Sequence, residues 1–176
     1  VHLLSACFCL GCSAIFHLFP IPSKMWMEVL SRLDSGGISV LIMGSSYPAI
    51  YYAFACSQVE KDRFIFLGII TVTSSACFVS TMVPAMSKPE YRKVRALMFI
   101  ILGLSAGIPM GWAVYFADQK YISTASWWMW ALGGAVYIIG AIIYAQRIPE
   151  RWYPGKFDLC FSSHNIFHLA VIAGCS

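Results

Sequence analysis

Residues Phe64–Met86 read FIFLGIITVTSSACFVSTMVPAM, and this stretch decides the fold class. It carries no charged side chain, and a helix needs about 20 predominantly apolar residues to cross the hydrocarbon layer of a membrane. Pro84 near its end is compatible with a helix in a membrane, where neighbouring helices and hydroxyl groups satisfy freed carbonyls. The stretch therefore predicts a transmembrane helix.

Similar apolar stretches recur along the rest of the chain, at roughly Leu3–Phe19, Ile38–Cys56, Ala96–Ala117, Trp127–Ala145 and Leu159–Cys175. Hydrophobic residues make up 59% of the sequence, charged residues only 11%, and the mean hydropathy is +0.71. A soluble domain carries about 25% charged residues. We expect an all-α integral membrane protein in which residues 1–176 form a single domain of six transmembrane helices.

The two ends of the sequence lie inside apolar stretches, at Val1 and Ser176. We interpret the chain as a fragment of a longer protein. The first stretch has no basic n-region and ends in Phe19-Pro20-Ile21-Pro22 instead of the small residues of a signal-peptide cleavage site. It is therefore also interpreted as a transmembrane helix.

Lysine and arginine residues predict the orientation. The first, third and fifth connections carry nine of them, whereas the second and fourth carry Lys61, Arg63 and Lys120. By the positive-inside rule, the first, third and fifth connections are cytoplasmic, in the plasma membrane or an internal membrane. The net charge of +4 is attributed to these loops facing anionic lipid. Membrane lipids are the expected partners, and nucleic acid is not.

The last apolar stretch contains His164-Asn165-Ile166-Phe167-His168. Two histidines four positions apart share one face of a helix, about 6 Å apart along its axis. Ionisable groups at membrane depth are costly and usually mark function. His17, near the predicted cytoplasmic end of the first stretch, would supply a third ligand for one Zn²⁺ ion. The alternative is that each histidine only hydrogen-bonds to a neighbouring helix.

A hydrolytic zinc site also needs a general base, and Asn165 stands where a His-Glu-x-x-His protease helix has its glutamate. Asp34 is the nearest inward-facing carboxylate predicted on the same side, and we expect it to accept a proton from water. Ser13 would add a hydrogen bond to that water or to a developing oxyanion. The simpler alternatives are a helix N-cap for Asp34 and a bond from Ser13 to the carbonyl of Cys9.

Other polar residues are given no site role. Cys9-Leu10-Gly11-Cys12 has the spacing of a zinc knuckle, but no second pair accompanies it. Cysteine also behaves as a small hydrophobe, so these residues are expected to pack. Asp158 is expected at the start of the last helix, where a carboxylate is favourable. His2 is expected to lie out of reach of the other histidines.

A set of ordered blocks covers nearly the whole chain: Ser13–His17, Leu33–Ile38, Leu41–Ser45, Arg147–Arg151 and Pro154–Asp158 running to Ser163–His168. In these blocks the sequence resembles the progestin and adipoQ receptor family, which is related to haemolysin III, and is most similar to its adiponectin-receptor members. The resemblance implies a seven-helix bundle with a cytoplasmic N-terminus, of which the first helix and the N-terminal region are missing here. It also implies a zinc ion near the cytoplasmic side.

The family's serine, aspartate and three zinc histidines fall on Ser13, Asp34, His17, His164 and His168. The resemblance implies hydrolysis of ceramide-like lipid amides. The sequence departs from the usual adiponectin-receptor pattern at Ser35-Gly36, where Tyr-Ser is usual, and at Asn165, where Gln is usual. These departures concern substrate and ligand preference and leave the zinc ligands intact.

Three functions follow as hypotheses. The first is an adiponectin-receptor-like membrane receptor whose intramembrane zinc site hydrolyses ceramide-like lipids, with a protein hormone as a candidate ligand. The second is a zinc-dependent membrane ceramidase with no hormone-receptor role. The third is a haem-binding membrane protein. Axial haem ligands approach from opposite faces, which a four-spaced pair on one helix cannot do, although His17 with one member of the pair can.

Overall fold

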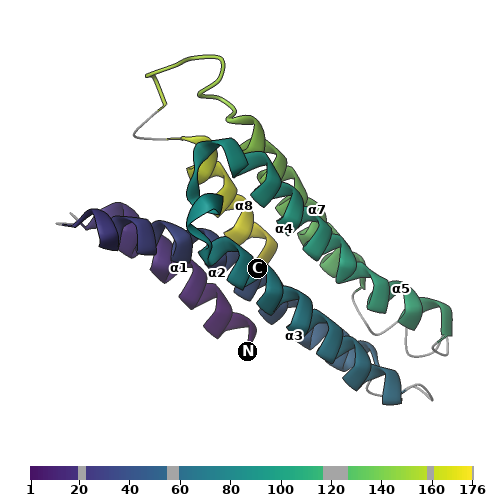
Figure 1. The fold of residues 1–176 in the computed structure, drawn as a ribbon. Helices are drawn as coiled ribbons and strands as arrows, with labels where there is room; N and C mark the ends of the chain where they lie inside the picture. Colours follow the sequence, from purple (N-terminus) through teal and green to yellow (C-terminus); the bar gives the residue numbers. More distant parts are fainter. Residues whose placement is uncertain (20–22, 55–59, 117–126, 158–160, 176) are drawn as a thin grey trace.

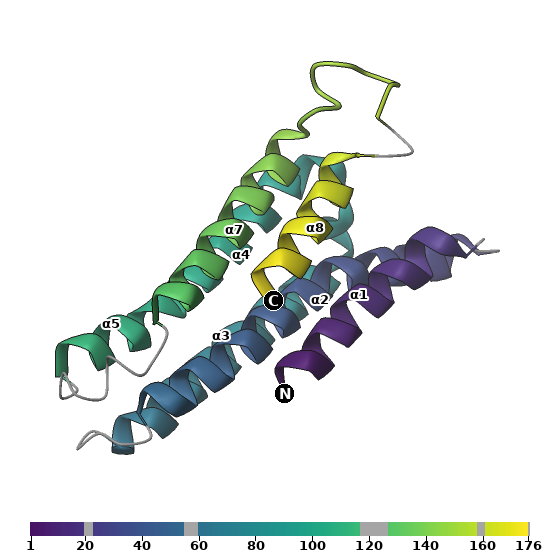
Figure 2. The same cartoon turned by 180° about the vertical axis from the view of Figure 1, so that it is seen from behind.

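The computed structural model describes residues 1–19, 23–54, 60–116, 127–157 and 161–175, and these residues are mostly helical, with a long non-helical stretch at residues 147–157 (Figures 1 and 2). The long elements run up and down in an elongated bundle. In chain order they are α1 (His2–Leu18), α2 (Lys24–Ala53), α3 (Glu60–Met82), η1 (Pro84–Ser87), η2 (Pro89–Tyr91), α4 (Arg92–Ser105), α5 (Gly107–Phe116), α7 (Trp127–Gln146) and α8 (Ser163–Cys175). The predicted all-α class is confirmed.

Each of the six predicted apolar stretches corresponds to one helix or helix pair. The fourth is divided, because α4 ends at Ser105 and α5 starts at Gly107. Pro109 explains the break: it has no N–H to donate to the carbonyl of Ser105, and its ring crowds that carbonyl. The two helices nevertheless follow one another in the bundle (Figure 1), so the pair occupies the place of one transmembrane helix.

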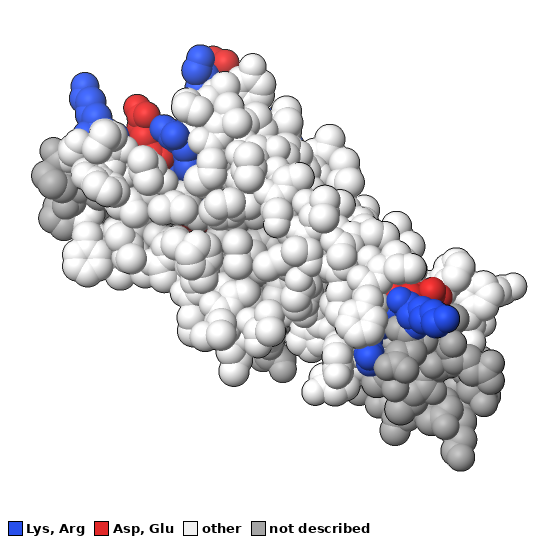
Figure 3. Space-filling view, turned by 60° about the horizontal axis from the view of Figure 1, so that its bottom comes forward, with Lys and Arg blue, Asp and Glu red and all other residues white. Residues whose placement is uncertain are grey.

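Three of the described segments are long and apolar enough to cross a membrane: Lys61–Met82, Pro89–Phe116 and Trp128–Gln146. The segment His2–Leu18 is a shorter apolar helix. Lysine, arginine, aspartate and glutamate side chains gather at the two ends of the face shown in Figure 3, with uncharged surface between them. Large apolar side chains such as Phe64, Ile65 and Val72 are exposed on α3. This surface suits contact with lipid.

Helix α2 begins well before its apolar stretch, at Lys24 instead of Ile38. Its first turns are amphipathic, and Glu28 accepts a hydrogen bond from Arg32 at 3.1 Å, an i,i+4 pair that supports a helix. Apolar length measures only the part of a helix that lies in hydrocarbon, so it could not reveal these turns. The N-cap is Ser23, and Asp34 lies in the helix interior. The N-cap interpretation of Asp34 is therefore wrong.

The bundle has two parts, α1–α3 and α4–α8, each packed more closely within itself than against the other. Within the first part, a Cβ added at Gly44 would lie 2.0 Å from the hydroxyl of Ser5, and one added at Gly37 would lie 3.0 Å from the backbone of Cys9. Small residues facing one another let membrane helices approach closely. This approach fixes α1 against α2 along its length.

Candidate metal centre

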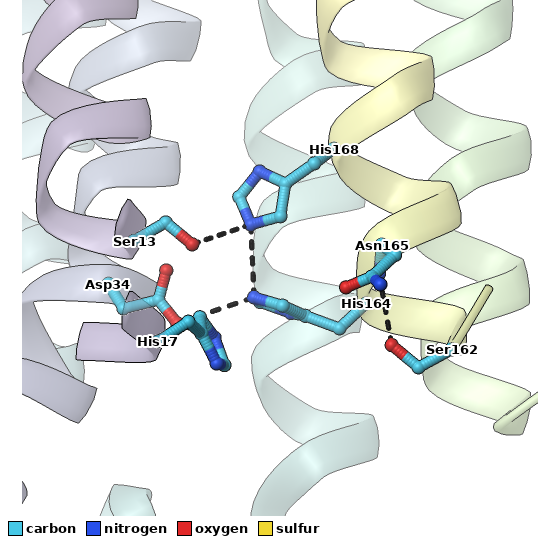
Figure 4. A network of polar contacts seen from close by, with 7 residues as sticks. All are labelled: Ser13, His17, Asp34, Ser162, His164, Asn165 and His168. Atoms are coloured by element: carbon cyan, nitrogen blue, oxygen red, sulfur yellow. Dashed lines mark hydrogen bonds and ion pairs between the residues drawn. The ribbon is translucent and has the colours of Figure 1, made fainter. Parts of the chain in front are cut away.

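The five side chains singled out in the sequence converge at one end of the bundle (Figure 4). Ser13 and His17 come from the last turns of α1, Asp34 from the interior of α2, and His164 and His168 from the first turns of α8. The C-terminal ends of α1, α3 and α7 and the N-terminal ends of α2, α4 and α8 lie at this same end (Figure 1). The predicted convergence is thus found within the described chain.

The carboxylate of Asp34 is the centre of this cluster. Its Oδ2 lies 3.4 Å from Nε2 of His17 and 3.4 Å from Nε2 of His164. The ligand atoms of these three residues all lie within 4.8 Å of one another. They form a His17–Asp34–His164 group that could hold a metal ion.

His168 extends the group on the side facing the bundle interior. Its Nε2 lies 3.0 Å from Nε2 of His164 and is hydrogen-bonded to Oγ of Ser13 at 2.8 Å. Figure 4 shows the two imidazoles projecting from α8 toward α1 and α2. The hydroxyl of Ser13 thus bonds to His168 on a different helix.

The donor separations fit a single ion. Ligand atoms around a tetrahedral ion bound at about 2.0–2.2 Å lie roughly 3.3–3.6 Å apart. Oδ2 of Asp34 lies 3.4 Å from each of two imidazole nitrogens, those of His17 and His164, and the donor atoms of these three residues lie within 4.8 Å of one another. The Nε2 atoms of His164 and His168 are 3.0 Å apart. Imidazole nitrogens and a carboxylate oxygen are also the donor types that zinc accepts. The donors are therefore gathered closely enough to surround one ion, and those that lie up to 4.8 Å apart must move closer to bind it.

Burial differs across the cluster. Asp34 and Ser13 are 6% and 5% exposed, whereas the side chain of His17 is 48% exposed. A buried carboxylate is costly unless it is paired or coordinates a metal. Oδ1 of Asp34 and Nδ1 of His168 are buried and have no hydrogen-bond partner among the described residues. The cluster is thus buried at Ser13 and Asp34 and exposed at His17.

The sequence analysis gave no role to Glu150, although it lies in one of the blocks that carry the family resemblance. Its Oε1 accepts hydrogen bonds from the backbone N–H of Ser163 at 2.9 Å and from the Ser163 hydroxyl at 2.8 Å. Ser163 is the first residue of α8 and is fully buried. Glu150 therefore satisfies an N–H at the start of the helix that carries His164 and His168.

The pKa of Glu150 is shifted by opposing causes. Burial alone would raise it, but the hydrogen bonds from its own backbone and from Ser163, with the nearby positive charge of Arg92, lower the pKa below its ordinary value. The glutamate is thus held as a carboxylate beside α8. Asp158, which we predicted for this position, lies outside the described residues. A glutamate thirteen residues upstream gives no helical-spacing signal, so the sequence did not reveal it.

An apolar cavity of about 130 Å³ adjoins the cluster in the gap between the two parts of the bundle. Ile38, one turn beyond Asp34, and Phe167, between the paired histidines, both line it. Tyr144 lines it as well, with its ring centroid 5.7 Å from that of His164. The remaining lining comes from α2, α4, α7 and α8 and is almost entirely apolar. The cavity is thus a space suited to hydrocarbon that lies next to the cluster, although none of the five cluster residues lines it.

The fold and this cluster define a class: an all-α multi-pass membrane protein with a candidate metal site between its helices. Residues 1–176 match the haemolysin-III related family. The chain belongs to that family, which confirms the resemblance to progestin and adipoQ receptors.

Relatives agree with this assignment. The chain is 39% identical over 171 residues to heptahelical transmembrane protein 4 of Arabidopsis thaliana, covering 96% of this chain and 43% of that protein. It is 39% identical over 174 residues to the adiponectin receptor protein of Drosophila melanogaster, covering 97% and 38%. It is 34% identical over 174 residues to heptahelical transmembrane protein ADIPOR2 of rice, covering 99% and 75%. The chain thus spans less than half the length of the first two.

Proposed function

We propose that this protein is an adiponectin-receptor-like membrane receptor whose polar cluster binds Zn²⁺ and hydrolyses lipid amides of the ceramide type. The observation that carries the proposal is the convergence of Ser13, His17, Asp34, His164 and His168 from three helices. Chain segments far apart in sequence bring three imidazoles, a carboxylate and a hydroxyl within reach of one another in an otherwise apolar bundle. Burying these polar groups in a membrane is costly, and ionisable groups at this depth usually mark a functional site.

His17, His164 and His168 would hold the zinc ion. Three neutral imidazoles leave its charge of +2 uncompensated and leave one coordination position open. When bound there, zinc supplies Lewis acidity that polarises a carbonyl and makes water more acidic. Support for this ligand set comes from the donor types, from the 3.0 Å separation between the Nε2 atoms of His164 and His168, and from the contact between the rings of His17 and His164, whose centroids lie 4.8 Å apart.

Asp34 is the proposed general base. Its Oδ2 is turned toward His17 and His164, while Oδ1 has no hydrogen-bond partner among the described residues. One carboxylate oxygen can therefore face the metal site while the other accepts a hydrogen bond from water and then its proton. That proton would pass to the amine that leaves when the amide C–N bond breaks.

Ser13 is the proposed hydrogen-bond donor for the reacting carbonyl. Its hydroxyl is nine-tenths or more buried and lies 2.8 Å from Nε2 of His168. Once Nε2 of His168 is committed to zinc, the serine hydroxyl is free to donate to a developing oxyanion. The residue would thus contribute to the rate more than to zinc affinity.

The apolar cavity supports a lipid substrate. It is lined by apolar side chains such as Phe99 and Val171, and by Ile38 and Phe167, which are close in sequence to Asp34 and to the paired histidines. An acyl chain in this space would place its amide at the polar cluster. The site would lie toward the cytoplasmic leaflet, an orientation that rests on the positive-inside rule.

The receptor part of the proposal draws on the relative named adiponectin receptor protein in Drosophila melanogaster. A protein hormone would then be the extracellular partner. The haem alternative finds no support in the geometry, because the rings of His17 and His164 are in contact, with centroids 4.8 Å apart. A macrocycle between these two residues would require their rings to move apart, and the alternative with His17 and His168 is tested by the visible absorption spectrum of the purified protein.

The metal content of the purified full-length protein tests the proposal. We expect about one zinc per chain by elemental analysis, and its loss in a His164→Ala/His168→Ala variant. His2→Ala is the matched control, because His2 lies at the opposite end of α1 and its removal should leave zinc bound. Absence of zinc from the wild-type protein, or equal zinc in the double variant, would overturn the zinc site and the hydrolysis with it.

A further inference from the structure

We propose that a basic pocket at the end of the bundle binds the phosphate group of an anionic membrane lipid. The pocket lies between the start of α4 and the end of α7 with the connection that follows it. It is a cavity of about 950 Å³, open to the outside, lined by Lys93, Ala145, Gln146, Arg147, Glu150, Arg151, Pro154 and Gly155. None of these residues belongs to the candidate metal centre.

Charge is the first argument. Three cations, Lys93, Arg147 and Arg151, line the pocket with one carboxylate, Glu150, which leaves a net charge of +2 from 3 minus 1. The Oε1 atom of that carboxylate is already hydrogen-bonded to Ser163. The three cationic side chains are exposed, and within the described chain none of them forms an ion pair. They are therefore available to an anion.

The residue types favour phosphate. An arginine guanidinium presents donors in a planar fork that matches phosphate oxygens, and lysine adds a compact point charge. Arg147 also has a left-handed backbone, with φ of 55°, and Gly155 has φ of 79°. A non-glycine residue in this region is uncommon and is often found at ligand sites. The backbone thus turns at the pocket instead of continuing α7.

The position favours a lipid over a soluble anion. Trp152 and Tyr153, in the same connection, are 64% and 57% exposed, and such side chains prefer the headgroup level of a membrane. Ile139 and Ile142 are exposed on α7 below the pocket, so apolar surface continues from it toward the hydrocarbon layer. Basic pockets between transmembrane helices on the cytoplasmic side bind anionic headgroups. A lipid can then occupy the pocket with its phosphate while its acyl chains follow α7.

The test is native mass spectrometry of the detergent-solubilised full-length protein titrated with dioctanoyl phosphatidic acid. We expect a saturable complex with one lipid per chain, which dioctanoyl phosphatidylcholine does not form. A cation near a membrane surface contributes about fivefold to the affinity for an anionic lipid. An Arg147→Asn/Arg151→Gln variant should therefore bind at least about tenfold more weakly. Asparagine is chosen at residue 147 because it tolerates a positive φ.

The control variant is Lys24→Gln/Lys156→Gln, which removes the same charge from exposed residues that do not line the pocket. Its affinity should stay within about twofold of the wild-type value. Lys93→Gln, on a different element, should weaken binding about fivefold. This single variant tests the pocket independently if the double variant misfolds.

Equal losses in pocket and control variants, or equal binding of phosphatidylcholine, would overturn the proposal. Displacement by inorganic phosphate at equal concentration would overturn the assignment to a lipid. The readout is independent of zinc and hydrolysis.

Discussion

Oε1 of Glu150 accepts two hydrogen bonds from Ser163, one from the backbone N–H at 2.9 Å and one from the hydroxyl at 2.8 Å. The next residue in α8 is His164, so this pair connects the loop after α7 to the helix turn that carries a candidate metal ligand. The first N–H groups of a helix have no partner within the helix. Glu150, which lies outside the helix, supplies a hydrogen-bond acceptor for one of these N–H groups.

Replacing Glu150 by alanine should therefore destabilise the protein and loosen the metal site. Loss of a cap with charge-assisted hydrogen bonds costs about 1–2 kcal/mol. We expect a lower melting temperature, measured by thermal unfolding in detergent, and weaker zinc retention during dialysis. Glu90→Ala is the control, because Glu90 is exposed and lies in η2. An unchanged melting temperature in Glu150→Ala would show that the cap is dispensable.

The same carboxylate predicts a pH dependence. The pKa of Glu150 is lowered below its ordinary value of 4.5 in the folded protein. A group with a depressed folded pKa stabilises the protein above its unfolded pKa, and this stability is lost as the pH falls through the folded pKa. The melting temperature of the wild type should thus exceed that of Glu150→Gln by a constant amount from pH 7 to about 5. The difference should shrink below about pH 4.5; shrinkage that is complete above pH 5 would contradict this assignment.

A third prediction concerns the contact between α7 and α8. A Cβ added at Gly140 would lie 2.7 Å from Cβ of Ala170 and 3.3 Å from the ring of Phe167. The added methyl group would push α7 and α8 apart. Gly140→Ala should therefore lower the free energy of unfolding by about 1–3 kcal/mol and displace α8 with its two histidines. Thermal unfolding and zinc content would both report this. Gly134→Ala, on the same helix with nothing within 4 Å, should be neutral or stabilising; equal effects would argue against close packing.

Asp34→Asn separates two roles for the aspartate. As a general base, Asp34 is needed for proton transfer, and we expect ceramide turnover to fall about 10²–10⁴-fold while zinc stays bound. As a fourth zinc ligand, it would be needed for the metal itself, and zinc would be lost with it. Zinc content and turnover measured on one preparation distinguish these outcomes. Retention of turnover would remove the catalytic role assigned here.

The extent of sequence-based prediction differs between features. Apolar length predicted six helical regions and their order, because charged residues are costly in hydrocarbon and the spanning segments therefore lack them. It did not predict the division of the fourth region into α4 and α5. It could not predict the start of α2 at Lys24, because amphipathic turns outside the hydrocarbon carry charges. The connection charges predicted that Asp34 and the histidines lie on the same side of the membrane. Their contact depends in addition on how α1 and α2 lie against α8, which the charges do not reveal. Glu150 was missed because a cap from another segment leaves no periodic signal.

Metal removal should weaken the connection between the two parts of the bundle and so lower the melting temperature. The cluster joins α1 and α2 to α8, and these parts otherwise pack less closely against one another than within themselves. An ion that binds only the folded state stabilises it by about 2.7 kcal/mol at a hundredfold excess over its dissociation constant. At 2–4 °C per kcal/mol, a chelator should lower the melting temperature by roughly 5–10 °C, and added zinc should restore it. The His164→Ala/His168→Ala variant should melt at the lower temperature whether or not zinc is present, whereas His2→Ala should respond like the wild type. A melting temperature that no chelator changes would mean that the cluster holds the bundle together through its own hydrogen bonds.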